Sequence, residues 1–263
     1  MRHWVFALLG LSALISTANA AVQSKKITYK HGDTDCIGYL AWDDAIEGKR
    51  PGIAVFHEFW GLDDYAKRRA DQLASMGYVA FAADMYGNGK HVDHPNDARG
   101  LMMTLRENVD DWKKRALEAL EVLKSQPQCD PSKLAAIGYC FGGSTCQQLA
   151  FAGTDLKAIA SFHGGLVKPT PEQVKAVKCA VLICNGAADS FIPEMAIKDF
   201  KEAMDKNGGK YNFKNYKDAL HSFTVPEATE TAKKYGIQIG YNKEADEQSW
   251  ADMKALFKET LGK

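Results

Sequence analysis

The sequence has no surplus of charge of either sign and no pair of cysteines at metal-binding or redox spacing. Lysine plus arginine and aspartate plus glutamate number 33 each. This balance gives no support for nucleic-acid binding, and the lack of a polybasic run gives none for attachment to an anionic membrane surface. No Cys-x-x-Cys occurs, which excludes the usual thioredoxin motif and the usual zinc-ligand spacing. The expected partner is a small molecule, with no metal and no nucleic acid.

Internal repeats, low-complexity tracts and domain linkers are also absent. The 263 residues are 46% hydrophobic and 25% charged, which is typical of one sizeable globular domain. Beyond residue 20, no stretch is apolar enough to cross a bilayer. We therefore expect a single domain over residues 21–263. The oligomeric state does not follow from the sequence, and a monomer is the default expectation.

The first 20 residues have the pattern of a cleaved signal peptide. Residues 1–3 carry positive charge, residues 4–15 are almost wholly apolar, and Ala18-Asn19-Ala20 has the small-x-small form of a signal-peptidase site. The alternative is an uncleaved membrane anchor, but the apolar core is shorter than the roughly 20 residues that a span needs. The pattern predicts export, a periplasmic or secreted location, and no membrane association after cleavage.

Export bears on the six cysteines of the chain. Disulfides are permitted in an oxidising compartment, but six cysteines in a chain of this length do not make a dense framework, and their pairing does not follow from sequence. Besides Cys140 they are Cys36, Cys129, Cys146, Cys179 and Cys184. If Cys140 is a free nucleophile, at least one of the other five is unpaired as well.

Apolar runs alternate with helical patterns along the chain. Residues 26–30 and 34–42 alternate as an antiparallel edge pair of strands does. The predicted buried strands are residues 53–57, 78–83, 133–137, 156–162, 180–185 and 211–216. The predicted helices are residues 63–76, 144–151, 193–207 and 243–261, with a long helical stretch broken near Glu107 and a connecting segment at residues 169–175. This alternation predicts one three-layer α/β domain, with a mostly parallel twisted sheet and helices on both faces.

The segment Gly138-Tyr139-Cys140-Phe141-Gly142-Gly143 closes one predicted strand and opens a helix. Glycines two residues before and after Cys140 allow the strand and the helix to approach closely, as in the nucleophile elbow Gly-x-Ser-x-Gly. Here cysteine stands in place of serine. The unpaired N–H groups and positive dipole of a helix N-terminus favour a thiolate at this position. The alternative is close strand–helix packing around an inert buried cysteine.

Two polar residues follow later strands at the same predicted edge of the sheet. Asp189 comes after residues 180–185, and His221 comes after residues 211–216. The order Cys140, Asp189, His221 is that of nucleophile, acid and base in the α/β-hydrolase fold. His221 would take the thiol proton and return one to the leaving group, while Asp189 would orient the imidazole. Taken singly, Asp189 also fits a helix N-cap and His221 a surface loop.

The loop after the first buried strand supplies further candidates. α/β-Hydrolases place one oxyanion-hole amide in this loop and another after the nucleophile, which points to the backbone N–H groups of Phe59 and Phe141. The candidate substrate-binding side chains are Trp60, Tyr86 and Lys90.

These motifs, in this order, resemble the dienelactone hydrolase family of α/β-hydrolases over residues 27–261. The resemblance is carried by His57-Glu58-Phe59-Trp60-Gly61-Leu62, Ala83-Asp84-Met85-Tyr86-Gly87, the six-residue segment around Cys140, Gly186-Ala187-Ala188-Asp189 and His221-Ser222-Phe223. It implies a Cys-His-Asp triad and no metal or organic cofactor. It also implies a glutamate beside the nucleophile, here Glu58, that helps to generate the thiolate.

One departure from the family pattern concerns the substrate. Members that cleave dienelactone are expected to bind the substrate carboxylate through arginine, including one on the loop after the fourth strand. Residues 86–91 contain no arginine, and Lys90 offers a charge without the bidentate fork. Acceptance of dienelactone therefore does not follow from the resemblance.

Thiolate chemistry narrows the expected reaction. When a thiolate adds to an ordinary ester, the thiolate is the better leaving group, so the intermediate reverts. We therefore expect hydrolysis of activated carboxylic esters or lactones through an acyl-cysteine on Cys140. Two alternatives stay open: an exported thiol redox protein with Cys146 as the partner of Cys140, and a non-catalytic small-molecule binder on a hydrolase fold.

Overall fold

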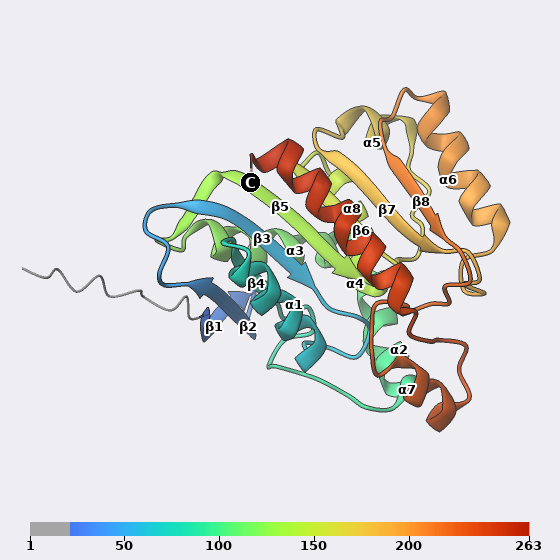
Figure 1. Ribbon diagram of the computed structural model, residues 1–263, viewed down its shortest axis with the longest axis horizontal. Helices are drawn as coiled ribbons and strands as arrows, with labels where there is room; N and C mark the ends of the chain where they lie inside the picture. Colours follow the sequence, from blue (N-terminus) through green and yellow to red (C-terminus); the bar gives the residue numbers. More distant parts are fainter. Residues whose placement is uncertain (1–21, 263) are drawn as a thin grey trace, which may run out of the picture.

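The computed structural model describes residues 22–262, so the predicted signal peptide lies outside the described residues. These residues form an eight-stranded sheet in the order β1-β2-β4-β3-β5-β6-β7-β8 (Figure 1). β2 runs against its two neighbours, and the other pairings are parallel. The strands are β1 (Val22–His31), β2 (Thr34–Asp43), β3 (Arg50–Phe56), β4 (Val79–Ala83), β5 (Cys129–Tyr139), β6 (Ala158–Phe162), β7 (Ala180–Gly186) and β8 (Asn212–Tyr216). The predicted edge pair and mostly parallel sheet are confirmed.

Helices cover both faces of this sheet, as the prediction requires (Figure 1). α1 (Asp64–Ser75) and α8 (Lys243–Leu261) pack on one face, whereas α3 (Val109–Lys124), α4 (Phe141–Phe151) and α6 (Glu194–Lys206) pack on the other. The remaining helices are α2 (Pro95–Arg106), α5 (Pro171–Ala176) and α7 (Ala228–Tyr235). No helix within residues 22–262 is both long enough and apolar enough to cross a membrane.

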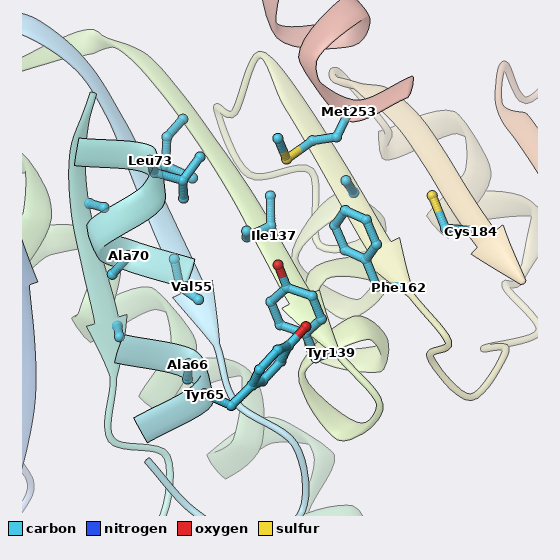
Figure 2. Packing of buried hydrophobic residues seen from close by; sticks show 14 of the residues in the cluster. Val55, Tyr65, Ala66, Ala70, Leu73, Ile137, Tyr139, Phe162, Cys184 and Met253 are labelled. Atoms are coloured by element: carbon cyan, nitrogen blue, oxygen red, sulfur yellow. The ribbon is translucent and has the colours of Figure 1, made fainter. Parts of the chain in front are cut away.

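Apolar side chains from α1, α8 and the strands fill one of the two cores. Figure 2 shows Leu73 of α1 and Met253 of α8 beside Val55, Ile137 and Phe162 of the central strands. Burying a side chain of this size contributes about 1.5–3 kcal/mol. Because both faces of the parallel strands are packed in this way, the C-terminal strand ends are held together at one edge of the sheet.

Three elements differ from the sequence prediction. α5 lies where a connecting segment is expected, although Thr170 and Gln173 form a capping box there. α7 has no predicted counterpart because it is only eight residues long and mostly polar, and its short apolar face of Ala228, Ala232 and Tyr235 buries only Ala228. α4 begins at Phe141 rather than at residue 144, because the turn from strand to helix takes only Cys140.

Candidate active site

Cys140 forms a one-residue turn between β5 and α4. Its backbone has φ 52° and ψ −112°, a conformation that is strained for any residue with a Cβ. A Cβ on Gly138 would collide with the carbonyl of Gly142, and a Cβ on Gly142 would collide with the carbonyl of Phe56. The two glycines therefore permit the close approach that the elbow pattern predicts, and Cys140 lies at the N-terminus of α4.

His221 and Asp189 come together at the end of the sheet where Cys140 lies. The Nδ1 atom of His221 is 2.7 Å from Oδ2 of Asp189, and Oδ1 of Asp189 accepts the backbone N–H of Phe191 at 2.9 Å. Burial opposes a charged His221. The negative charge of Cys140 and the hydrogen bonds to Asp189 and Cys140 nevertheless raise the pKa of His221 well above its usual range. The three residues predicted from strand ends therefore lie in one contiguous group.

Cys140 differs from the other five cysteines, all of which are free thiols as well. It is partly exposed, whereas the others are buried. Burial raises the pKa of Cys36 to about 11 and that of Cys184 to about 12, and it raises the pKa of Cys146 well above the usual range. Cys140 is therefore the cysteine best placed to react with a molecule from solution.

The backbone N–H groups of Phe141 and Phe59 are the two predicted donors of an oxyanion hole. Phe141 is the first residue of α4, so its N–H has no helical partner. Among residues 22–262, no acceptor is recorded for the N–H of either Phe141 or Phe59. The two segments are tied together because Gly142 donates its N–H to the carbonyl of His57 at 3.0 Å. Both donors thus remain available to an oxygen atom beside the thiol.

Tyr86 supports both of these segments. Its hydroxyl donates to the carbonyl of Phe59 at 3.0 Å, and its ring stacks on Phe141 with centroids 5.8 Å apart. Burial and the nearby Cys140 raise the pKa of the phenol, so Tyr86 stays neutral. Its contacts within the chain therefore support the segments that carry the two N–H donors, and they account for its position without a substrate contact.

Glu58 is a buried carboxyl group beside the triad, with only 3% of its surface exposed. Its Oε1 accepts the hydroxyl of Ser222 at 2.6 Å. Burial raises the pKa of Glu58 to about 7, although the Ser222 hydrogen bond and the nearby His221 and Trp60 lower it. A carboxyl group with this pKa changes its charge near neutral pH.

His163 is a residue of this site that the sequence prediction missed. It directly follows β6, and its Nδ1 accepts the backbone N–H of Cys140 at 3.1 Å. Its Nε2 lies 2.7 Å from Oγ1 of Thr224, which also accepts the hydroxyl of Tyr65 at 2.6 Å. Burial and the charge of His221 lower the pKa of His163 well below its usual range. Its place after a predicted strand was the signal that could have identified it.

The other two predicted substrate-binding residues, Trp60 and Lys90, have fewer contacts with the residues around Cys140. Trp60 packs on Phe59 with ring centroids 4.3 Å apart. Lys90 is exposed, and no contact of its ammonium group with the site is recorded within residues 22–262. A cation does approach from α2, because Nη2 of Arg106 lies 3.3 Å from the position that a Cβ on Gly165 would take. The sequence offered no indication that the last turn of α2 reaches the loop after β6.

The described residues offer acyl-transfer chemistry at this edge of the sheet. No group of three or more His, Cys, Asp or Glu side chains within residues 22–262 is arranged to hold a metal ion. What the site does contain is a thiol, an imidazole paired with a carboxylate, two free N–H donors and a second, buried carboxyl group. Together these are the parts of a nucleophilic hydrolase.

A parallel sheet with an elbow after β5, an acid after β7 and a histidine after β8 defines the α/β-hydrolase class. Comparison with family models narrows the class, since residues 37–261 match the dienelactone hydrolase family. The chain belongs to the dienelactone hydrolase family, as the motifs predict. This membership confirms the prediction of a carboxylic ester hydrolase that acts on ester or lactone bonds.

Individual relatives cover most of the chain. A carboxymethylenebutenolidase from a Pseudomonas species is 30% identical over 206 residues, which are 73% of this chain and 84% of that protein. Protein usf from Aquifex pyrophilus is 31% identical over 177 residues, or 66% of this chain and 76% of that one. A solved dienelactone hydrolase-like promiscuous phosphotriesterase from metagenomic libraries has a TM-score of 0.87 and 37% identity, covering 92% of this chain and 99% of that chain.

Proposed function

We propose that the protein hydrolyses activated carboxylic esters and lactones through an acyl-cysteine formed on Cys140. The observation that carries the proposal is the position of His221, which bonds to Asp189 at 2.7 Å and whose pKa is raised by the nearby Cys140. A thiol and an imidazole that share a proton supply a thiolate nucleophile near neutral pH. The strained turn at Cys140 presents this thiolate beyond the end of β5.

In the acylation step, the thiolate of Cys140 adds to the carbonyl carbon and a C–S bond forms. The carbonyl electrons move to oxygen, where the N–H groups of Phe59 and Phe141 stabilise the negative charge. The C–O bond to the leaving group then breaks, and the imidazolium of His221 gives its proton to the departing oxygen. Asp189 holds the ring in the tautomer and orientation that this transfer needs.

In the deacylation step, neutral His221 takes a proton from water while the hydroxyl oxygen adds to the acyl carbon. The C–S bond breaks, the carboxylic acid leaves, and the electrons return to Cys140 as thiolate. His221 then holds the proton again, so the resting pair is restored. We assign Glu58 to the ionisation of a resting thiol, whose proton it can accept in place of His221, because its pKa of about 7 lets it exchange a proton near neutral pH.

Turnover of an aryl ester by the purified protein, beside Cys140→Ala and Cys140→Ser, tests this proposal. Intact-mass measurement under acidic quench should find one acyl group on the wild-type chain and none on Cys140→Ala. Circular dichroism of both variants controls for folding. Turnover that survives in Cys140→Ala, or a mass adduct on another residue, would refute the acyl-cysteine mechanism.

The two alternative functions predict other results in the same experiment. A redox protein would form a reversible Cys140–Cys146 disulfide, yet Cys146 is fully buried in the core beneath α4. A non-catalytic binder would remove ester from solution without releasing acid. Release of stoichiometric acid and alcohol, with all thiols still titratable, would exclude both.

A second activity is proposed from the relative described as a promiscuous phosphotriesterase, which is 37% identical to this chain. The same thiolate and N–H donors suit a neutral phosphotriester, because its P=O oxygen also gains negative charge on nucleophilic attack. Hydrolysis of a 4-nitrophenyl dialkyl phosphate that is lost in Cys140→Ala would support this activity. Equal rates for the wild type and the variant would contradict it.

We also propose that residues 1–20 direct export and are then removed, on the pattern of charge, apolar residues and Ala18-Asn19-Ala20. Amino-terminal sequencing of protein from the periplasmic or culture fraction should begin at residue 21. Full-length protein in the cytoplasmic or membrane fraction would contradict export with cleavage.

A further inference from the structure

A cavity of about 370 Å³ lies next to the candidate active site and has no part in the mechanism above. Three segments build its walls: the loop after β3 with the start of α1, residues 91–93, and the chain from Val225 through α7. Its volume falls in the lower part of the range of about 300–1,000 Å³ that is usual for small-molecule sites. It is therefore large enough for one ring-sized group.

Glu58 connects this cavity to the nucleophile. It is one of the lining residues, and its Oε1 lies 3.8 Å from Nδ1 of His163. That nitrogen accepts the N–H of Cys140 at 3.1 Å. When the carbonyl carbon of an ester lies beside Cys140, either its acyl group or its leaving group can therefore extend into the cavity.

The walls of the cavity offer apolar and aromatic surface. Trp60 and Val92 contribute one side, and Val225 and Tyr235 contribute the other. Surface of this kind binds hydrocarbon rings by burial, at about 25 cal/mol for each Å² of apolar area removed from water.

The basic side chains at the rim are already paired. Nη2 of Arg68 lies 2.7 Å from Oε1 of Glu227, and Nδ1 of His91 lies 3.8 Å from Oδ1 of Asp93. Nζ of Lys234 lies 4.7 Å from the ring centroid of Tyr235. A carboxylate on the ligand would have to compete with Glu227 for Arg68 and with an aromatic ring for Lys234.

The acidic side chains that line the cavity outnumber the basic ones, with five carboxyl groups against Arg68, His91 and Lys234. Two of the five, Glu58 and Asp63, are shielded from solvent, and burial raises the pKa of both. A ligand carboxylate would make their ionisation still more costly, since like charges in a poorly solvated site repel strongly. The cavity therefore disfavours anions.

Backbone contacts hold the walls in place before any ligand binds. Val92 donates its N–H to the carbonyl of Trp60 at 2.9 Å, and Gly61 pairs with His91 in an isolated bridge. α7 is held to α1 by the Arg68 ion pair. A preformed site spends little binding energy on ordering.

We propose that this cavity binds an uncharged aromatic ring on one side of the scissile bond and selects against substrates that carry a carboxylate there. The inference rests on the proposed function and adds to it a substrate class, neutral ring-bearing esters. The ring packs between Trp60 and α7, while the ester group extends past Glu58 to Cys140.

Filling the cavity tests the inference. Thr231 lines the cavity from α7, so Thr231→Trp should occupy it, whereas Lys233→Trp places the same side chain on the exposed side of α7. The substrates are vinyl acetate without a ring, vinyl benzoate with a ring on the acyl side, and phenyl acetate with a ring on the leaving group. We expect Thr231→Trp to lower kcat/KM about 10-fold for one of the two ring esters and to leave vinyl acetate unchanged, with Lys233→Trp changing none.

The predicted selection against a carboxylate is tested with the ring ester whose kcat/KM is lowered by Thr231→Trp. Its para-carboxylate derivative should react with kcat/KM about 10-fold below that of the nearly isosteric, neutral para-carboxamide derivative, once each value is divided by the rate constant for hydroxide-catalysed hydrolysis of the same ester. Equal rates for the two derivatives would overturn the inference, as would equal effects of Thr231→Trp on all three parent esters. Val92→Trp, which fills the cavity from the opposite wall, repeats the test if Thr231→Trp does not fold.

Binding to Cys140→Ala separates this inference from the proposed mechanism. Ligand-observed NMR with methyl benzoate and benzoate needs no turnover, so it reports on the cavity even if the wild type hydrolyses none of the esters. Binding of methyl benzoate that exceeds that of benzoate and is weakened by adding Thr231→Trp supports the inference. Equal binding of the two ligands, or no effect of the second substitution, refutes it.

Discussion

His163 and His221 both lie beyond the C-terminal ends of parallel strands, β6 and β8, yet the fold shifts their pKa values in opposite directions. Their ring centroids are 5.4 Å apart, and both residues are at least nine-tenths buried. The pKa of His221 is raised well above the usual range and that of His163 is lowered well below it. Burial alone would lower both values, so the partners of each ring decide the difference.

The partners differ in charge. His221 faces the carboxylate of Asp189 and the sulfur of Cys140, both of which favour an imidazolium. Nδ1 of His163 accepts the N–H of Cys140, which a protonated nitrogen could not do. The 3.8 Å approach of Glu58 to that nitrogen is therefore not an ion pair. In the proposed mechanism His221 exchanges protons with the substrate, whereas His163 holds the backbone of Cys140.

Removing His221, the charged histidine, should lower kcat more than any other substitution in this comparison. His221→Ala removes the group that ionises the thiol and protonates the leaving group, so kcat for an aryl ester should fall about 10⁴-fold. Steady-state kinetics and the amplitude of the acylation burst measure this loss. A decrease of less than about 10-fold, with native circular dichroism, would contradict the assigned role of His221.

Glu58, which lies 3.8 Å from His163 and also feels the charge of His221, should affect the pH dependence of stability. Folding raises its pKa from 4.5 to about 7, so its contribution to stability is complete below pH 4.5 and is lost as the pH rises through 7. The shift corresponds to at most about 3 kcal/mol. Glu58→Gln should therefore lose less unfolding free energy than the wild type between pH 4.5 and 8 in urea titrations. The exposed Glu230→Gln serves as control, and parallel curves for the wild type and Glu58→Gln would refute the shift.

Removing the carboxylate that orients His221 should cost less than removing His221 itself. Asp189→Ala should lower kcat about 10²-fold, because water and the remaining contacts can partly orient the ring. The pKa of His221 should fall in the same variant, since one of the interactions that raise it is lost. Rates for Asp189→Ala and His221→Ala that are equal would contradict this ranking.

Replacing His163, the neutral histidine, should lower kcat least, and a conservative substitution should restore most of the lost activity. His163→Leu removes one of the two acceptors for the N–H of Cys140 and leaves the carbonyl of Phe162 at 3.0 Å, and we expect kcat to fall about 10-fold. His163→Asn retains an acceptor near Nδ1 and tolerates the positive φ of 39°, so its kcat should stay within about twofold of wild type. Equal losses in the two variants would show that the acceptor is unimportant.

The same histidine predicts the behaviour of the protein in acid. Because folding lowers the pKa of His163, its contribution to stability is present above the ordinary value near 6.5 and is lost as the pH falls below it. His163→Asn should therefore lose less unfolding free energy than the wild type between pH 7 and 5. A steeper loss in the variant would contradict a neutral His163.

Most of the fold was accessible from sequence because its signals are local. α8 spans the predicted residues 243–261, and the break predicted near Glu107 separates α2 from α3. α7 was missed because it is short and mostly polar, with an apolar stripe of only Ala228, Ala232 and Tyr235. That helix supplies a wall of the cavity, so the feature proposed to select substrates was the one that local patterns could not predict.

The sequence by itself determined the balanced charge, the alternation of strands and helices, and the order of Cys140, Asp189 and His221 after successive strands. Each of these depends on neighbours along the chain or on the common direction of parallel strands. Only the tertiary structure decided which histidine is charged and where the cavity lies. The contacts responsible join distant segments, such as Glu58 with Ser222, 164 residues apart, and Tyr65 with Thr224, 159 residues apart. Protonation depends on burial and on nearby charges, and both arise when the folded chain brings such segments together.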